Sequence, residues 1–190
     1  MEKIQFKKVK EARGLQPGET AKDFSAVDLK ENVFSLSEAL KSGPVVVIFY
    51  RGQWCPFCNK HLKHLQQNLE NIYEKGASVI AVSPEKSEFL KRTAEKTHAS
   101  FSLLYDEGYK IADAFDVAFR PSKFERMIYN KVLKAELKNS HSDDSEQLPI
   151  PATFIIGQDG KIIWRHFDPD YKKRSDVTDI VKNLPVKSRN

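Results

Sequence analysis

Hydrophobic residues in this chain gather in short β-branched runs, which alternate with longer stretches whose apolar residues recur at helical spacing. The run at 44–50 is typical of a buried strand, and the stretch at 56–75 keeps its apolar residues on one helix face until Gly76 ends it. The pattern repeats as a strand at 77–83 and a helix at 84–98. This order predicts neighbouring parallel strands joined by helices.

The segments on either side carry weaker patterns. We expect an N-terminal arm over 1–14, an extended hairpin from strands at 20–29 and 33–34, and a short helix capped by Ser35 or Ser37. Further along, the pattern predicts a strand at 101–105 and a short helix at 109–115. Near the end of the chain it predicts a strand pair at 148–157 and 162–167, joined by the turn at Asp159-Gly160. A last helix over 175–184 and a frayed tail over 185–190 follow.

Residues 116–149 interrupt this alternation. Helical spacing over 124–137 is followed by a polar loop at 139–146, so this part reads as an insert that could form a lid or a partner surface near the functional site. The whole chain, 1–190, is therefore predicted to be one α/β domain. Its central mixed sheet has helices on both faces, an N-terminal hairpin extension, and the helical and loop insert before a late hairpin.

Composition narrows the function classes. The 190 residues are 40% hydrophobic and 30% charged, which is ordinary for a globular domain. The net charge of +5 comes from basic residues spread along the chain, apart from the run 172–174, which favours a solvated surface over nucleic-acid binding. No apolar run is long enough for a membrane span, and the N-terminus lacks the apolar core of a signal peptide. We expect a cytoplasmic protein with no membrane or nucleic-acid partner.

The residues best suited to catalysis lie where a predicted strand meets a predicted helix. The chain has two cysteines, Cys55 and Cys58, three positions apart between the buried strand at 44–50 and the helix that Pro56 begins. A helix N-terminus stabilises a thiolate, so we expect an exposed, acidified Cys55 with Cys58 one turn inside, close enough to form a disulfide. The alternatives are two inert buried cysteines or half of a zinc site. No second cysteine pair exists and the five histidines are scattered, so we expect a redox dithiol and no metal.

Three blocks read together resemble the peroxiredoxin-like AhpC/TSA branch of the thioredoxin-fold superfamily. The blocks are Pro17-Gly18 through Asp23-Phe24 and Leu36-Ser37, Phe49-Tyr50-Arg51-Gly52 running into Trp54-Cys55-Pro56-Phe57-Cys58, and Pro149-Ile150-Pro151-Ala152-Thr153-Phe154 followed by Asp159-Gly160. Each block alone is weak, but their order and spacing over roughly residues 15–184 make the match strong. The resemblance implies a thioredoxin-like fold and thiol redox chemistry.

The chain departs from the peroxiredoxin pattern P-x-x-x-T/S-x-x-C. Its last cysteine, which attacks peroxide in that family, falls at Cys58, while Arg51 stands at the proline position and Cys55 at the Thr/Ser position. The arginine that the family places before the late strand is replaced by Pro151. The residues that orient peroxide in the family are therefore largely absent.

What remains is similar to thioredoxin: Trp54, a C-x-x-C motif around Pro56, and a proline before a strand. The resemblance implies a cis Ile150–Pro151 bond, with both residues positioning the substrate beside the dithiol; the alternative is a trans proline at a strand start. The buried carboxylate that thioredoxins use for proton transfer is missing, because Phe49 stands there.

Three residues are candidates to tune the thiols. Glu85 could replace the missing carboxylate, although its position at the start of a predicted helix equally suits a charge favoured by the helix dipole. Arg51 could favour a thiolate by charge, and His61 could act as an acid or base; either could instead be a solvated surface residue.

Three functions compete at this point. The first is dithiol–disulfide exchange, in which Cys55 attacks a protein or small-molecule disulfide and Cys58 resolves the mixed disulfide. The second is a thiol peroxidase that reduces hydrogen peroxide or organic hydroperoxides, with a thioredoxin- or glutathione-type electron donor. Family position favours Cys58 as the attacking thiol and location at the helix start favours Cys55, and we favour Cys55. The third is a non-enzymatic binding module. No cofactor is implied, because the sulfurs carry the electrons.

Overall fold

The structure is a computed structural model that describes residues 5–185. Its strands are β1 (Ser25–Val27), β2 (Val33–Ser35), β3 (Val45–Phe49), β4 (Ser78–Ser83), β5 (Ser102–Tyr105), β6 (Ala118–Phe119), β7 (Leu148–Pro149), β8 (Ala152–Ile156) and β9 (Ile162–Phe167). Its helices are α1 (Leu36–Ser42), α2 (Pro56–Gln67), α3 (Leu69–Tyr73), α4 (Ser87–Thr97), the 3-10 turn η1 (Glu107–Tyr109), α5 (Lys110–Ala114), α6 (Lys123–Lys131), α7 (Leu137–Ser140) and α8 (Val177–Asn183).

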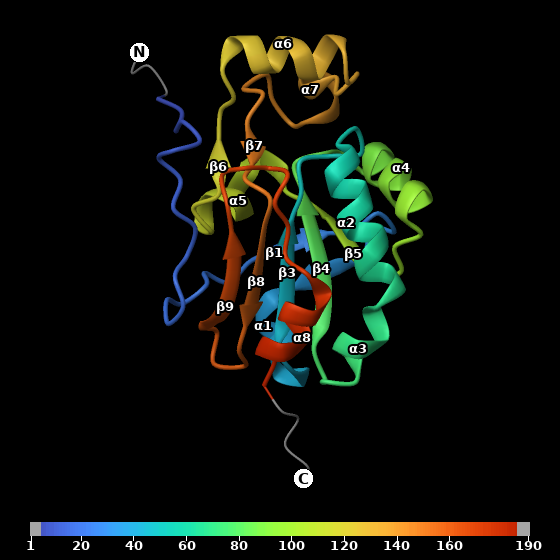
Figure 1. Cartoon of the computed structure of the whole chain (residues 1–190), viewed down its shortest axis with the longest axis vertical. Helices are drawn as coiled ribbons and strands as arrows, with labels where there is room; N and C mark the ends of the chain where they lie inside the picture. The colour runs from blue at the N-terminus through green and yellow to red at the C-terminus, as the bar shows by residue number, and fades with distance from the viewer. Residues whose placement is uncertain (1–4, 186–190) are drawn as a thin grey trace.

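The central sheet has the strand order β5-β4-β3-β8-β9. β3 is parallel to β4 and β4 to β5, whereas β8 is antiparallel to both β3 and β9. The sheet is therefore mixed, as predicted. Because right-handed crossovers are the rule, the helices that connect β3, β4 and β5 share one face. Figure 1 shows α2, α3 and α8 in front of the sheet, with α1 and α5 behind it.

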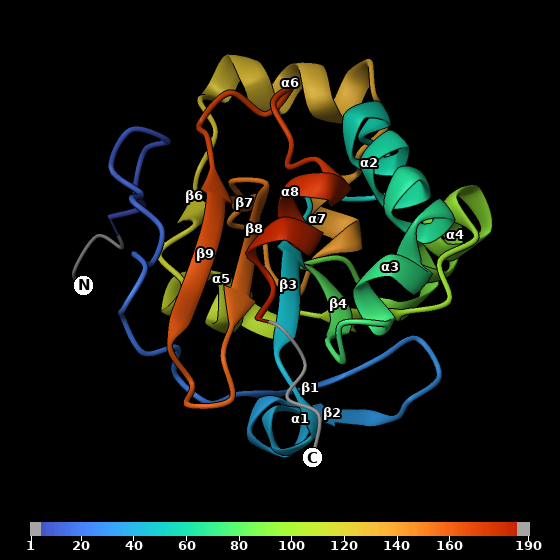
Figure 2. The ribbon, with the colours of Figure 1, turned by 60° about the horizontal axis from the view of Figure 1, so that its bottom comes forward.

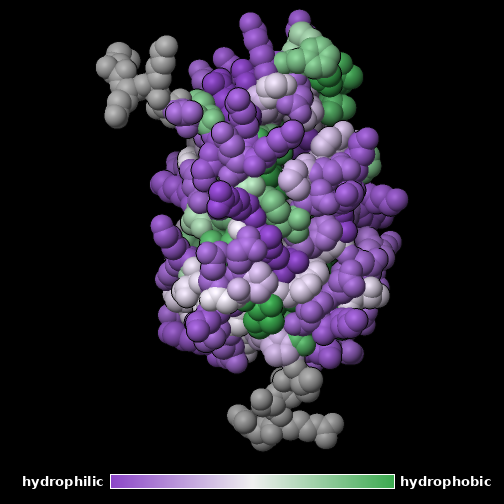
Figure 3. Space-filling model, turned by 60° about the vertical axis from the view of Figure 1, so that its left-hand side comes forward, coloured by the Kyte–Doolittle hydropathy of each residue, from purple (hydrophilic) through white to green (hydrophobic). Residues whose placement is uncertain are grey.

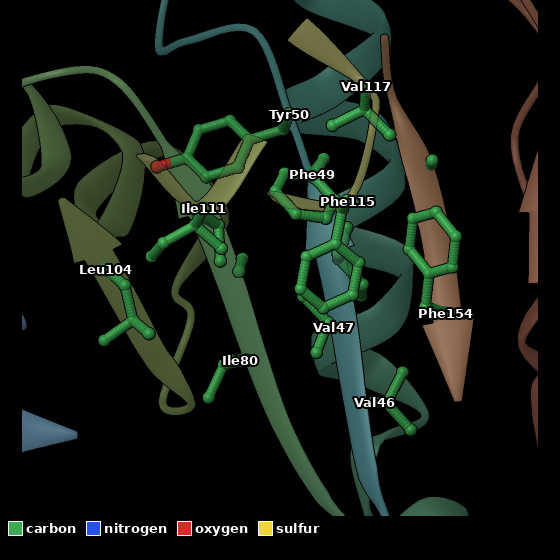
Figure 4. Close-up of a cluster of buried hydrophobic side chains, with 14 of the residues drawn as sticks. Val46, Val47, Phe49, Tyr50, Ile80, Leu104, Ile111, Phe115, Val117 and Phe154 are labelled. Atoms are coloured by element: carbon green, nitrogen blue, oxygen red, sulfur yellow. The ribbon is translucent and has the colours of Figure 1, made fainter. Parts of the chain in front are cut away.

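Aromatic packing fixes the rear face of the sheet. The Phe115 ring lies 5.2 Å from the ring centroids of both Phe49 on β3 and Phe154 on β8. All three side chains are buried, and Figure 4 shows them pointing toward one another beside Val47. This cluster packs the short helix α5 against the end of β3. The loop that follows β3 therefore begins at a tightly packed strand end.

Several predicted boundaries need correction. The helix expected over 56–75 is broken at Asn68, whose φ of −118° and ψ of 16° end α2 before α3 begins. The helix expected over 124–137 ends at Lys131. The strand expected over 148–157 is divided, because β7 leaves the central sheet and pairs with β6. Of the strand expected over 20–29, only β1 forms, although Thr20 bridges to Lys161 and Asp28 to Leu104.

The insert covers one end of the molecule. In Figure 1, α6 and α7 lie beyond the end of the sheet to which β3 points. A capping box between Ser122 and Glu125 starts α6. The outer side of this region exposes Phe124, Met127 and Val132, and Figure 3 shows a hydrophobic cluster at this end of an otherwise mostly hydrophilic face. No helix within residues 5–185 is long and apolar enough to cross a bilayer.

Candidate active site

The turn between β3 and α2 places both cysteines. Tyr50 continues the pairing with β4 by donating its backbone N–H to the Val82 carbonyl, at 3.1 Å. The Cys55 N–H then donates to the Gly52 carbonyl, at 3.1 Å, which closes the turn. Cys55 is the N-cap residue of α2 and Pro56 its first helical residue, as predicted. The Cys55 side chain therefore sits at the helix N-terminus, where the dipole favours a negative charge.

The two thiols are in contact, and no disulfide bond joins them in the structure. The Cys58 Sγ donates a hydrogen bond to the Cys55 Sγ at 2.7 Å. The expectation of an exposed Cys55 is wrong, because both cysteines have 0% of their surface exposed. Residues distant in sequence cover both sulfurs.

Arg51 is the cationic partner of Cys55. Its Nη2 donates to the Cys55 Sγ at 3.4 Å, and its Nη1 donates to the Tyr129 hydroxyl at 3.2 Å. The guanidinium also lies 4.0 Å from the ring centroid of Tyr171 and 4.9 Å from that of Trp54. Aromatic faces stabilise a cation where water is excluded. Arg51 is thus held in the site and is not a solvated surface residue.

These contacts separate the acidities of the two thiols. The hydrogen bond from Cys58 and the charge of Arg51 outweigh burial and lower the pKa of Cys55 to about 5. Burial, together with the proton that Cys58 shares with Cys55, raises the pKa of Cys58 well above its ordinary value. At neutral pH the pair is therefore a Cys55 thiolate next to a Cys58 thiol.

Glu85 lies inside the site and not on a helix. The predicted helix start is three residues too early, because α4 begins at Ser87. The Glu85 side chain is fully buried and its Oε2 accepts the Gln53 N–H at 2.8 Å, while Oε1 has no hydrogen-bond partner. Burial raises the pKa of this carboxyl to about 8. Parallel strands end at the same edge, which is why a residue just after β4 reaches the loop after β3.

His61 belongs to a buried polar chain. Its Nε2 lies 3.2 Å from the Ser175 hydroxyl, which lies 2.8 Å from the Thr153 hydroxyl of β8. Burial and the charge of Arg174 lower the pKa of His61 to about 4, so the ring is neutral at pH 7. This chain ties α2 to the loop between β9 and α8.

The expected cis Ile150–Pro151 bond is wrong, because the peptide bonds joining residues 5–185 are all trans. The Ile150 N–H donates to the Val117 carbonyl at 2.8 Å, so the backbone runs extended from β7 into β8. Because Phe49 pairs with Ala152, Pro151 still lies level with Tyr50 at the start of the dithiol loop. The trans proline at a strand start was the alternative reading of this sequence.

Trp54 is buried, with 6% of its surface exposed, and stacks on Tyr129 of α6 with ring centroids 5.1 Å apart. The insert thus covers the dithiol from one side. The loop between β9 and α8 covers it from another: the Arg174 Nη2 donates to the Cys58 Sγ at 3.4 Å, and Tyr171 lies on Arg51. Figure 2 shows this loop crossing from β9 toward α2 and α6.

Sequence reasoning missed Tyr129, Tyr171 and Arg174. The basic run at 172–174 was the only signal for Arg174, and it read as solvated charge. Within residues 5–185, no group of three or more histidine, cysteine or acidic side chains comes together that could hold a metal ion.

A mixed sheet with two cysteine sulfurs in contact at the start of α2 defines a thioredoxin-fold protein with a dithiol site. The chain belongs to the AhpC/TSA family, whose model matches residues 17–165. This confirms the resemblance found in the sequence.

Individual proteins similar to this chain are named as peroxiredoxins or as thiol-disulfide oxidoreductases. Peroxiredoxin Bcp of Escherichia coli K12 is 28% identical over 169 residues, which cover 89% of this chain and 94% of the relative. The thiol-disulfide oxidoreductase ResA of Bacillus cereus is 24% identical over 150 residues, covering 78% of this chain and 68% of the relative. The crystal structure of the peroxidoxin BcpB of Mycobacterium tuberculosis shares the fold, with a TM-score of 0.68 at 23% identity over 90% of this chain and 96% of that one.

Proposed function

We propose that this protein exchanges its dithiol for the disulfide of a protein or small-molecule substrate, with Cys55 as the nucleophile. The observation that carries the proposal is the contact between the two sulfurs at 2.7 Å, in which Cys58 donates and Cys55 accepts. Arg51 adds a second donor to Cys55, at 3.4 Å. An acidified thiol at the helix N-terminus, paired with a protonated thiol one turn further along the helix, is the arrangement that disulfide exchange needs.

The reaction proceeds in two steps. The Cys55 thiolate attacks one sulfur of the substrate disulfide, the substrate S–S bond breaks, and the leaving thiolate takes a proton from solvent. Cys58 then loses its proton and attacks the Cys55 sulfur of the mixed disulfide, which releases the second substrate thiolate and leaves a Cys55–Cys58 disulfide. Two electrons pass to the substrate, and a thioredoxin- or glutathione-type donor returns them.

Glu85 is the proposed proton acceptor for Cys58 in the second step. It is fully buried just after β4, and one of its oxygens has no hydrogen-bond partner in the structure. Its pKa of about 8 suits exchange of a proton with a thiol near neutral pH. Trp54, Pro56, Ile150 and Pro151 would shape the surface that the substrate meets once the cover opens. This chemistry suits the cytoplasm, where thiols are kept reduced.

A peroxidase activity is the second candidate, favoured by the family and by the relatives named peroxiredoxin. The Cys55 thiolate would attack a peroxide oxygen, break the O–O bond and become a sulfenic acid, with water or an alcohol as the other product. The Cys58 thiol would then condense with the sulfenic acid and release water, giving the same Cys55–Cys58 disulfide.

Single-cysteine variants test the main proposal. With a protein disulfide as substrate, Cys58→Ser should accumulate a mixed disulfide through Cys55, and Cys55→Ser should accumulate none. Stopped-flow rates with hydrogen peroxide and with the protein disulfide then rank the two activities. Rapid sulfenic acid formation without a trapped mixed disulfide would overturn disulfide exchange in favour of the peroxidase.

A further inference from the structure

A cavity of about 380 Å³ lies beside the dithiol, between the first turns of α2 and the loop that joins β9 to α8. The lining residues that matter here are Phe57, Lys60, His64, Lys172, Arg174 and Asp176. The proposed reaction uses none of them as a reactant. The volume suits a small molecule and is too small for a folded partner.

The cavity has an excess of positive charge. Lys60, Lys172 and Arg174 contribute three cations, and none of them forms an ion pair with a carboxylate in the part of the chain that the structure describes. The one acidic side chain, Asp176, is engaged elsewhere: its Oδ1 accepts the Thr178 N–H and the Thr178 hydroxyl, each at 2.8 Å. Cations that lack a partner in a concave site attract an anionic ligand.

Arg174 connects this cavity to the thiols. It lines the cavity, and its Nη2 donates to the Cys58 Sγ at 3.4 Å. Its Nη1 donates to the carbonyls of Tyr171 and Lys173, so the guanidinium is held by the loop. Phe57, the residue between Pro56 and Cys58, forms another wall, with its ring 5.7 Å from that of Tyr171. A ligand in the cavity is therefore one side chain away from a reacting sulfur.

We propose that this cavity binds the carboxylate of a small anionic disulfide, so that the enzyme prefers substrates with negative charge near their sulfur atoms. Lys60 and Lys172 hold the carboxylate. Arg174 exchanges its contact with Cys58 for one with the ligand, which loosens the cover over the dithiol. The inference rests on the proposed disulfide exchange, and the two electrons and the leaving thiolates are those of that reaction.

Three disulfides of similar length test the proposal: dithiodipropionate, which is anionic, bis(hydroxyethyl) disulfide, which is neutral, and cystamine, which is cationic. Oxidation of the reduced enzyme is followed by its tryptophan fluorescence. At low ionic strength we expect dithiodipropionate to react roughly tenfold faster than cystamine, and added salt to reduce this ratio. The double variant Lys60→Gln, Lys172→Gln should bring the ratio close to one.

Lys63→Gln is the matched control, because Lys63 is an exposed lysine on the same helix that does not line the cavity. Its rate ratio should equal that of the unmodified enzyme. An unchanged ratio in the double variant, or an equal loss in Lys63→Gln, overturns the cavity proposal while disulfide exchange stands. Oxidation by none of the three disulfides and by no protein disulfide overturns both.

Discussion

Arg51 occupies the position where the family pattern has proline, and its guanidinium lies between the Cys55 sulfur and three aromatic rings. A proline there would supply neither a charge nor a donor to the thiolate. The change therefore belongs with the other departure from the pattern, the cysteine at position 55. Together they place an acidified thiol one helical turn before the usual one.

Replacing Arg51 by methionine should raise the pKa of Cys55. Methionine keeps much of the apolar contact with the rings but removes the charge and the hydrogen bond, so we expect a rise of about 1 or more. The measurement is the pH dependence of alkylation by iodoacetamide in the Cys58→Ser background, which leaves one thiol. Arg13→Met, at an exposed arginine far from the dithiol in sequence, should leave the profile as it was. A profile equally unmoved by Arg51→Met would remove Arg51 from the site.

At the scale of helices and strands, the sequence predicted the part of the site that lies in one contiguous segment and missed the residues that come from distant segments. The strand, turn and helix around Cys55 and Cys58 are contiguous, so periodicity and the proline at the helix start were enough to place both cysteines. Tyr129 and Arg174 reach the same site from α6 and from the loop after β9, across separations that no local pattern encodes. The trans Ile150–Pro151 bond was mispredicted for a related reason: the pairing of β6 with β7, which fixes that segment, involves strands of two residues each.

The loop between β3 and α2 has no room for a side chain at Gly52. Its φ is +152°, and a Cβ built there would lie 2.5 Å from the Glu85 Oε1 and 2.6 Å from the Trp54 Nε1. Gly52→Ala should therefore lower the free energy of unfolding by roughly 1–3 kcal/mol and change the Trp54 fluorescence. Gly18→Ala is the control, since Gly18 also has a positive φ, +91°, but no atom within 4 Å of its Cβ position. Urea unfolding measures both variants. An equal decrease in the free energy of unfolding for the two would show that backbone strain at positive φ, and not the steric clash at Gly52, causes the loss.

At the scale of the whole molecule, the titrations of Glu85 and Cys55 give the free energy of unfolding opposite dependences on pH. The folded pKa of Glu85 is raised to about 8 from an ordinary 4.5, so its stabilising contribution is complete below the ordinary value and is lost as pH rises through 8. The folded pKa of Cys55 is lowered to about 5 from 9.0, so its contribution is complete above the ordinary value and is lost as pH falls through 5. Between pH 5 and 8 the two largely cancel.

Glu85→Gln should remove one side of this balance. The amide oxygen of glutamine can still accept the Gln53 N–H, so the fold is kept while the titrating group is lost. Relative to the unmodified protein, the free energy of unfolding of the variant should increase with pH, at up to about 1.4 kcal/mol per pH unit, between pH 5 and 8. Urea unfolding of the reduced proteins across this range measures the difference, with Glu88→Gln on the exposed side of α4 as control. A difference that stays constant with pH would mean that Glu85 does not titrate between pH 5 and 8. A carboxyl without a raised pKa would be too weak a base to take the Cys58 proton near neutral pH.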